Sequence, residues 1–145
     1  MLARTGQVLA VAALLLTPAA AQTPVDKPFA EHHIVLQLSN RAQDKQLLVL
    51  SVAYNLLKAY DPDKISVVVV AFGPGIDLLR KESHNRARVD SLISQGVEFD
   101  ICMNTVDTVE REGGHVNINP KAVRVQVGVG RILELAEKGY TIVRP

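Results

Sequence analysis

The feature that most constrains the fold is a four-valine run, residues 67–70, inside a longer, mostly apolar segment in the middle of the chain. Residues 65–72 read Ile-Ser-Val-Val-Val-Val-Ala-Phe. A strand with one solvent-facing side alternates apolar and polar residues, whereas this run is apolar on both sides. Strands of this kind are typical of parallel sheets that are covered by helices on each face. The run therefore predicts an α/β fold.

Strand and helix patterns alternate along the rest of the chain. Strands are predicted at 33–38, 65–72, 97–101, 123–127 and 140–143. Helices are predicted at 44–60, 84–95, 103–112 and 129–139, with a short helical turn at 76–80. Asp44 and Ser83 are the expected N-caps of the first two long helices, and Gly96 is an expected helix stop. The βαβαβαβαβ order predicts a mostly parallel five-stranded sheet with right-handed helical crossovers.

The first long helix carries more apolar residues than contact with one sheet face requires. Its main apolar face is widened by Leu47, Leu48 and Leu50. A helix that is apolar over so wide an arc is expected to be covered twice. We expect the sheet to cover one side and another subunit to cover the other.

The first 21 residues have the features of a secretory leader. Arg4 is the only charge, residues 8–16 are apolar, and Ala19-Ala20-Ala21 offers a small-residue cleavage site. The apolar run is too short to span a bilayer, so cleavage after about Ala21 is favoured over a retained anchor. This predicts a periplasmic protein with no membrane contact after cleavage.

The mature chain is expected to be a flexible arm at 22–31 followed by one α/β domain at 32–145. Sixteen basic and 15 acidic residues are present in the whole chain, and loss of Arg4 leaves 15 of each. A balanced charge gives no reason to expect nucleic acid or an anionic membrane as a partner.

Cys102 is the only cysteine, so it has no internal disulfide partner. It follows a predicted strand and begins a predicted helix. Free N–H groups and the helix dipole at such a position favour an anion, and a thiolate is one. Cys102 is therefore the best candidate for a catalytic residue. The alternative is a buried cysteine that acts as a small apolar filler.

Further candidate residues lie in loops at the carboxyl ends of the strands, where parallel sheets bind ligands. The substrate-binding candidates are Ser39, Asn40, Gly73, Gly75, Asn104 and Thr105. The two glycines form either an anion nest or only a tight turn, and Thr105 also suits a helix cap. His115 could assist Cys102 as a base, or it is a solvated loop histidine.

Several other chemistries are disfavoured by the sequence. His32 and His33 are neighbours on a strand, so they point to opposite faces and cannot bind one metal ion. The Gly128-Val129-Gly130 turn lacks the third glycine of a dinucleotide loop, and no Gly-x-Ser-x-Gly is present. We predict no metal and no cofactor.

Three segments in order resemble the DsrE/DsrF-like family of sulfur-relay proteins. They are Ala71-Phe72-Gly73-Pro74-Gly75, then Gln95-Gly96-Val97-Glu98-Phe99 leading to Cys102 with Asn104-Thr105, and finally Gly139-Tyr140 with Arg144-Pro145. The resemblance covers residues 32–145 and is greatest to exported members, although residues 107–121 do not follow the family pattern. It implies a three-layer α/β/α sandwich, assembly into trimers or hexamers, and a Cys102 that accepts sulfur as a persulfide and passes it on.

Two functions are consistent with these observations. The first is a periplasmic sulfur carrier or sulfurtransferase, whose partners are sulfur donor and acceptor proteins or small sulfur compounds. The second is a non-enzymatic oligomeric module that binds a small ligand and has a structural cysteine. A buried Cys102 with apolar neighbours would favour the second function, and an open cleft would favour the first.

Overall fold

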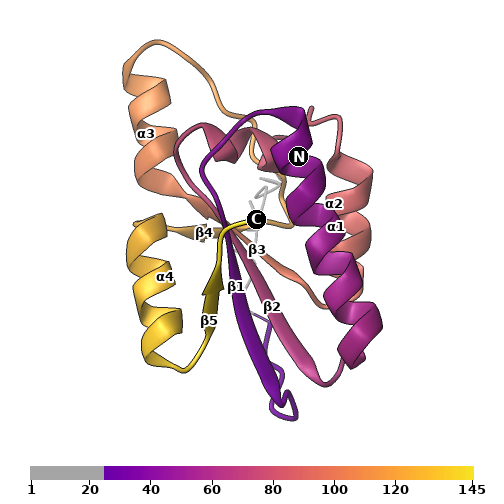
Figure 1. Cartoon of the computed structure of the whole chain (residues 1–145). Coiled ribbons are helices and arrows are strands. Elements are labelled where there is room, and N and C mark those ends of the chain that lie inside the picture. Colours follow the sequence, from indigo (N-terminus) through magenta and orange to yellow (C-terminus); the bar gives the residue numbers. More distant parts are fainter. Residues whose placement is uncertain (1–24) are drawn as a thin grey trace, which may run out of the picture.

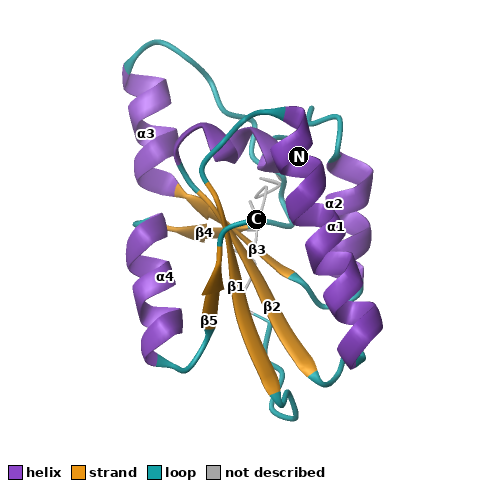
Figure 2. Ribbon diagram, viewed as in Figure 1, coloured by secondary structure: helices purple, strands orange, loops and turns teal. Residues whose placement is uncertain are grey.

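The predicted parallel sheet is present, with strands β1 (His32–Leu38), β2 (Ile65–Ala71), β3 (Glu98–Cys102), β4 (Val123–Val125) and β5 (Thr141–Val143). The computed structural model describes residues 25–145, so the expected leader at 1–21 lies outside the described residues. The spatial order is β4-β3-β2-β1-β5, and all four strand pairings are parallel (Figures 1 and 2). Every residue of the central strand β2 is buried, as its β-branched run predicts.

Helices cover both faces of the sheet and complete the α/β/α sandwich (Figure 2). The helical elements are α1 (Gln43–Tyr60), the 3₁₀ helix η1 (Gly73–Leu79), α2 (Arg86–Ser94), α3 (Met103–Arg111) and α4 (Gly128–Glu137). The larger core joins one sheet face to α1, η1 and α2, and Val106 of α3 packs into it. A smaller core joins the opposite face to α4 through Ile132 and Leu135.

The path of the chain places the loops after the strands at one edge of the sheet. From β1 to β4, each strand is added beside the one before it, across the sheet. α4 then crosses the face opposite to α1 and α2 and leads to β5 on the far side of β1 (Figure 1). Parallel strands have their carboxyl ends on the same side, so the loops that follow β1, β2, β3 and β4 gather there. His32 and His33 confirm the expected alternation, because their rings contact Tyr60 of α1 and Tyr140 beside α4, respectively.

Two predicted N-caps are wrong. α1 begins at Gln43, so Asp44 lies inside its first turn, and Asn40 Oδ1 accepts the Ala42 N–H (2.8 Å) in the turn before the helix. α2 begins at Arg86, and Ser83 Oγ accepts the Asn85 N–H (3.2 Å) ahead of it. In both places a short polar side chain organises the preceding turn, an alternative that competes with capping.

The extra apolar width of α1 is partly used inside the same chain. Leu50 is buried and, with Leu92 of α2, lines the junction of these two helices. Leu48 is 42% exposed. A neighbouring helix therefore covers part of the surface for which another subunit was expected.

The described part of the predicted flexible arm, residues 25–31, is hydrogen-bonded to the domain. The Val25 N–H donates to Glu98 Oε2 (2.7 Å). Lys27 Nζ donates to the carbonyls of Pro62 (2.7 Å) and Ile65 (3.0 Å). These contacts hold the segment beside β2 and β3. None of the helices in residues 25–145 is long and apolar enough to cross a membrane.

Candidate functional site

Cys102 is the last residue of β3 and the N-cap of α3, the junction that the sequence predicts. Side chains on β3 alternate between faces, so Cys102 shares the face of Glu98 and Asp100 that α4 covers. The residue is 6% exposed. By the exposure criterion this burial favours a structural cysteine, but the sulfur also has backbone hydrogen-bond partners at Gly128 and Gln126.

The start of α4 lies directly against the sulfur. The Gly128 N–H donates to Cys102 Sγ (3.2 Å), and the thiol lies 3.8 Å from the Gln126 carbonyl that can accept its hydrogen. A Cβ atom at position 128 would lie 3.0 Å from the Cβ atoms of Cys102 and Phe72. Glycine at this position therefore allows the backbone of α4 to approach the thiol.

Two opposing effects act on the pKa of the Cys102 thiol. Burial raises the pKa, because a buried thiolate loses its hydration. Hydrogen bonds from the Thr105 side chain, the Gly128 N–H and the backbone N–H groups of Thr105 and Asn104 lower it, and the net pKa is below that of an ordinary thiol. The site thus favours the nucleophilic form of cysteine.

Thr105 connects Cys102 to the glycine loop after β2. Its Oγ1 accepts the Gly73 N–H (3.0 Å) and its hydroxyl is a donor toward the sulfur. The Gly75 N–H donates to the Phe72 carbonyl (3.1 Å), and a Cβ at Gly75 would lie 2.2 Å from the Leu38 carbonyl oxygen. Both N–H groups are occupied internally, as in a tight turn. Substrate binding by Gly73 and Gly75 stays a prediction and would need other atoms of this loop.

Asn104 holds the connection between β4 and α4 beside the cysteine. Its backbone N–H donates to the Gln126 carbonyl (3.1 Å), and Gln126 Nε2 donates to its Oδ1 (2.6 Å). Ser39 and Asn40 lie in the neighbouring loop after β1. The Ser39 carbonyl oxygen is close to Gly73, since a Cβ atom added to Gly73 would lie 4.0 Å from it. The structure therefore gathers most of the predicted site residues, with Gln126 as a contributor that sequence reasoning missed.

His115 makes its contacts elsewhere. Its side chain is 74% exposed, its Nε2 lies 2.9 Å from Asn117 Oδ1, and its carbonyl accepts a hydrogen bond from Arg80 (2.8 Å). Its described hydrogen bonds involve neither Cys102 nor the residues around the sulfur. The contacts are those of a solvated loop histidine, the alternative to an assisting base.

Three charged residues beneath Cys102 were not predicted. Arg131 of α4 donates through Nε to Asp100 Oδ2 and through Nη2 to Glu98 Oε1, both at 2.9 Å. Asp100 is fully buried, and its Oδ1 has no partner among the described residues. Burial, and then the neighbouring Glu98, raise the pKa of Asp100 to about 8 against the opposing effect of Arg131. The sequence signal was the alternation of Glu98, Asp100 and Cys102 on one strand face.

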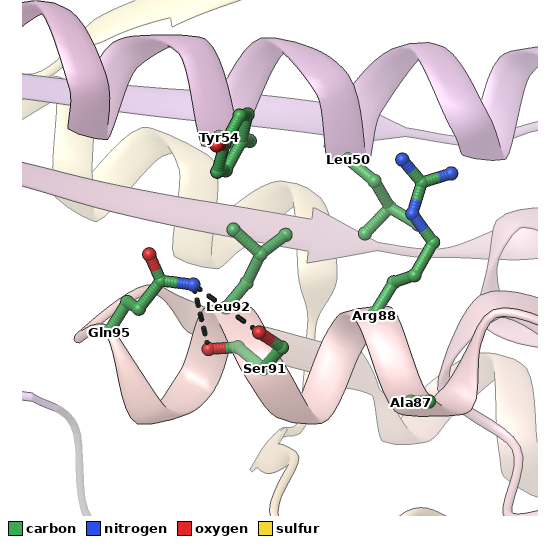
Figure 3. A pocket seen from close by; sticks show the side chains of 7 residues that line it. All are labelled: Leu50, Tyr54, Ala87, Arg88, Ser91, Leu92 and Gln95. Carbon is green, nitrogen blue, oxygen red and sulfur yellow. Dashed lines mark hydrogen bonds between the residues drawn. The ribbon is translucent and has the colours of Figure 1, made fainter.

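A separate cleft of about 340 Å³ lies between α1 and α2 (Figure 3). Its lining residues are Leu50, Tyr54, Ala87, Arg88, Ser91, Leu92 and Gln95. α1 and α2 cover the sheet face opposite to the one that holds Cys102. A smaller hollow of about 180 Å³ lies beside the site, where Gly73, Pro74 and Thr105 contribute to its wall. Within residues 25–145, no group of three or more acidic, histidine or cysteine side chains is arranged to hold a metal ion.

The fold and site define an α/β/α sandwich with one hydrogen-bonded cysteine at the carboxyl end of a central strand. No protein-family model and no curated protein sequence matches the chain. A solved structure of similar fold is MTH1491 from Methanobacterium thermoautotrophicum, a protein of unknown function. The two chains share 27% sequence identity with a TM-score of 0.72, over 79% of this chain and 100% of MTH1491. This likeness supports the α/β/α fold.

Proposed function

We propose that this protein is a periplasmic sulfur-relay protein that carries sulfur as a persulfide on Cys102. The observation that carries the proposal is the set of hydrogen-bond donors directed at Sγ, which lowers the pKa of a buried thiol. The resemblance to DsrE/DsrF-like proteins in the segments around Cys102 supports it. Among residues 25–145, the hydrogen bonds of Sγ involve no acidic or basic side chain, which suits a carrier.

The transfer step needs only a thiolate and a donor persulfide. The Cys102 thiolate attacks the outer sulfur of R–S–SH, so that a bond forms to Sγ while the donor's S–S bond breaks. The donor leaves as the thiolate R–S⁻, and the outer sulfur keeps its hydrogen. Charge and electrons balance without an external oxidant. Attack by an acceptor thiolate on the same outer sulfur would regenerate the Cys102 thiolate.

The surroundings of Cys102 suit a carrier. The Gly128 N–H is fixed by the backbone of α4, so it can stabilise the thiolate before sulfur is accepted and again after sulfur is passed on, without rearranging. Because Cys102 is only 6% exposed, the sulfur can be reached only by small sulfur compounds or by a partner that inserts its donor group. Such restriction protects the persulfide from adventitious thiols in solution.

The test is intact-mass measurement after exposure to inorganic polysulfide. The full chain is expressed with its leader and purified in the form that the cell produces, so that the same mass also reports whether cleavage follows Ala21. We expect a gain of one sulfur atom that dithiothreitol removes. Cys102→Ser is the matched control and should gain none. An unchanged mass in the wild-type protein, or an equal gain in the variant, would contradict the proposal.

The 6% exposure of Cys102 favours a second candidate, the oligomeric ligand-binding module with a structural cysteine. This function requires a thiol that reacts no faster than a free cysteine at the same pH. Alkylation of the native protein with iodoacetamide below the ordinary thiol pKa separates the two. Fast alkylation supports the carrier, and protection of the thiol together with no sulfur uptake supports the module.

A further inference from the structure

α4 contacts β3 at two points on the same side of the sheet. Gly128 and Arg131 lie three residues apart, so they project from one face of the first turn of α4. Gly128 reaches Cys102 at the end of the strand, and Arg131 reaches the two acidic residues that precede Cys102 on the same strand face. The helix that supplies a donor to the sulfur is thus fixed to the strand that carries the sulfur.

The second contact is buried and geometrically specific. The Arg131 side chain is 14% exposed, and the side chains of Glu98 and Asp100 are 3% and 0% exposed. Two different nitrogens of one guanidinium bind the two carboxyl groups, each at 2.9 Å. A planar guanidinium with donors in fixed directions sets the angle and register of α4 on β3 more tightly than a single ammonium could.

The charges of this cluster do not cancel when both acids are ionised. Asp100 keeps its proton near neutral pH, because burial and Glu98 raise its pKa to about 8, which leaves one carboxylate for Arg131. Glu134 of α4 approaches Arg131 at 3.7 Å from the exposed side. Asp26 and Lys138 line the hollow beside the cluster, and the Val25 N–H also donates to Glu98.

We propose that Arg131 is a positioning residue for Cys102: by binding Asp100 and Glu98 on β3, it holds α4 in the register that directs the Gly128 N–H at Sγ. Arg131 does not touch the sulfur, and its effect passes through the backbone of α4. The proposal concerns the thiol whose use as a sulfur carrier is proposed above, but it does not depend on which compound reacts there.

The consequence is a measurable coupling between Arg131 and the ionisation of Cys102. When Arg131 is removed, α4 is free to shift, and the 3.2 Å hydrogen bond from Gly128 lengthens. The thiolate then loses a donor while the thiol remains buried, so the pH at which it ionises rises.

The experiment measures the rate of Cys102 alkylation by iodoacetamide as a function of pH in the full chain. We expect Arg131→Met to raise the midpoint of this profile by about one pH unit, or to slow alkylation about tenfold below it. Arg131→Lys should give an intermediate midpoint, because lysine can bind one carboxylate but not fix both. In a ¹⁵N-labelled sample, the Gly128 amide shift should titrate with Cys102 in the wild type and respond less in Arg131→Met.

Arg124→Met is the matched control. Arg124 is an exposed arginine on β4, paired with Ile101, and it points to the opposite face of the sheet from Cys102. This variant should keep the wild-type midpoint. A wild-type midpoint and a wild-type Gly128 response in folded Arg131→Met would overturn the proposal.

A charge-free variant covers the case in which Arg131→Met does not fold. Glu98→Gln, Asp100→Asn and Arg131→Met together leave no buried unpaired charge in the cluster, because Glu134 is exposed. They should raise the midpoint as Arg131→Met does. If this variant also fails to fold, a wild-type midpoint in Arg131→Lys overturns the proposal. Failure of sulfur uptake in the wild type would not affect these thiol measurements, so the two proposals fail separately.

Discussion

At Cys102, the cost of burying a charge is opposed by fixed hydrogen-bond donors. Burial alone would keep the thiol protonated, but donors led by the Thr105 hydroxyl and the Gly128 N–H lower its pKa. Thr105 has a double role, because its oxygen accepts the Gly73 N–H while its hydroxyl faces the sulfur. The loop after β2 and the thiol after β3 are thereby joined by one side chain.

Thr105→Val tests this double role with almost no change in shape. The variant leaves the Gly73 N–H without its acceptor and removes a donor from Cys102. We expect a loss of about 1–2 kcal/mol in the free energy of unfolding and a higher pH midpoint for alkylation of Cys102. Urea unfolding and the alkylation profile are the measurements. Thr105→Ser keeps the hydroxyl and should retain the wild-type midpoint, and an equal rise in both variants would contradict the role given to the hydroxyl.

At the scale of elements, β3 and α4 form the unit that matters for the site. Glu98, Asp100 and Cys102 of β3 face α4. Arg131 of α4 binds the two acids, and the Gly128 N–H binds the sulfur. A strand face of two acids and a thiol would be unfavourable in an apolar core, because buried charges require partners. The arginine, together with the proton retained by Asp100, makes the pairing of these two elements possible.

The raised pKa of Asp100 predicts how stability depends on pH. In the unfolded chain an aspartate ionises near pH 4, whereas in the folded protein the pKa of Asp100 is about 8. The native state therefore binds the extra proton between these values. The part of the free energy of unfolding that depends on this proton is fully present below about pH 4. It is lost as the pH rises toward 8, by at most about 1.4 kcal/mol per pH unit.

Asp100→Asn should remove this dependence, because an amide does not titrate. Urea unfolding from about pH 5 to 8 should show the wild type losing stability relative to the variant as the pH rises. Asp107→Asn on α3, an exposed acid, is the control and should follow the wild-type curve. Parallel curves for the wild type and Asp100→Asn would contradict the raised pKa.

At the scale of the whole molecule, one group of exposed apolar side chains lies on α4, just before it and on β5. Val129 and Leu133 lie one turn apart on α4, each 59% exposed, with Val127 at 50% and Ile142 of β5 at 47%. Adjacent exposed apolar residues of this kind often mark protein–protein contacts. They support the proposal that the protein is a homo-oligomer. Because Val127, Val129 and Leu133 are more exposed than the exposed apolar side chains of α1, which are 42–47% exposed, we place the expected contact at α4.

The oligomer proposal predicts a solution mass of three or six chains by analytical ultracentrifugation. Leu133→Asp should reduce the mass to that of the monomer, because a charge would be buried at the contact. Leu48→Asp on α1 makes the same change at a site that is 42% exposed and should leave the assembly intact. A monomeric wild type would contradict the proposal, and dissociation by Leu48→Asp alone would return the contact to α1.

The sequence determined the elements, because their signals are local. The β-branched run at 65–71 required a strand buried on both faces, and Gly96 and Gly139, with φ of +88° and +92°, ended their helices as glycine permits. The position of Cys102 between a strand and a helix could also be read directly from the chain. Helix starts were predicted less well, because Asn40 and Ser83 organise turns that local pattern does not distinguish from caps.

Only the tertiary structure decided what surrounds Cys102. Gly128, Gln126 and Arg131 lie 24 to 29 residues further along the chain, and no local pattern links them to the sulfur. They reach β3 because α4 crosses back over the sheet from β4 to β5, which is a property of the strand order. The sequence by itself therefore determined where the thiol lies on the fold. The packing of α4 decided which donors lower its pKa, because hydrogen bonds between distant segments form only when the layers are assembled.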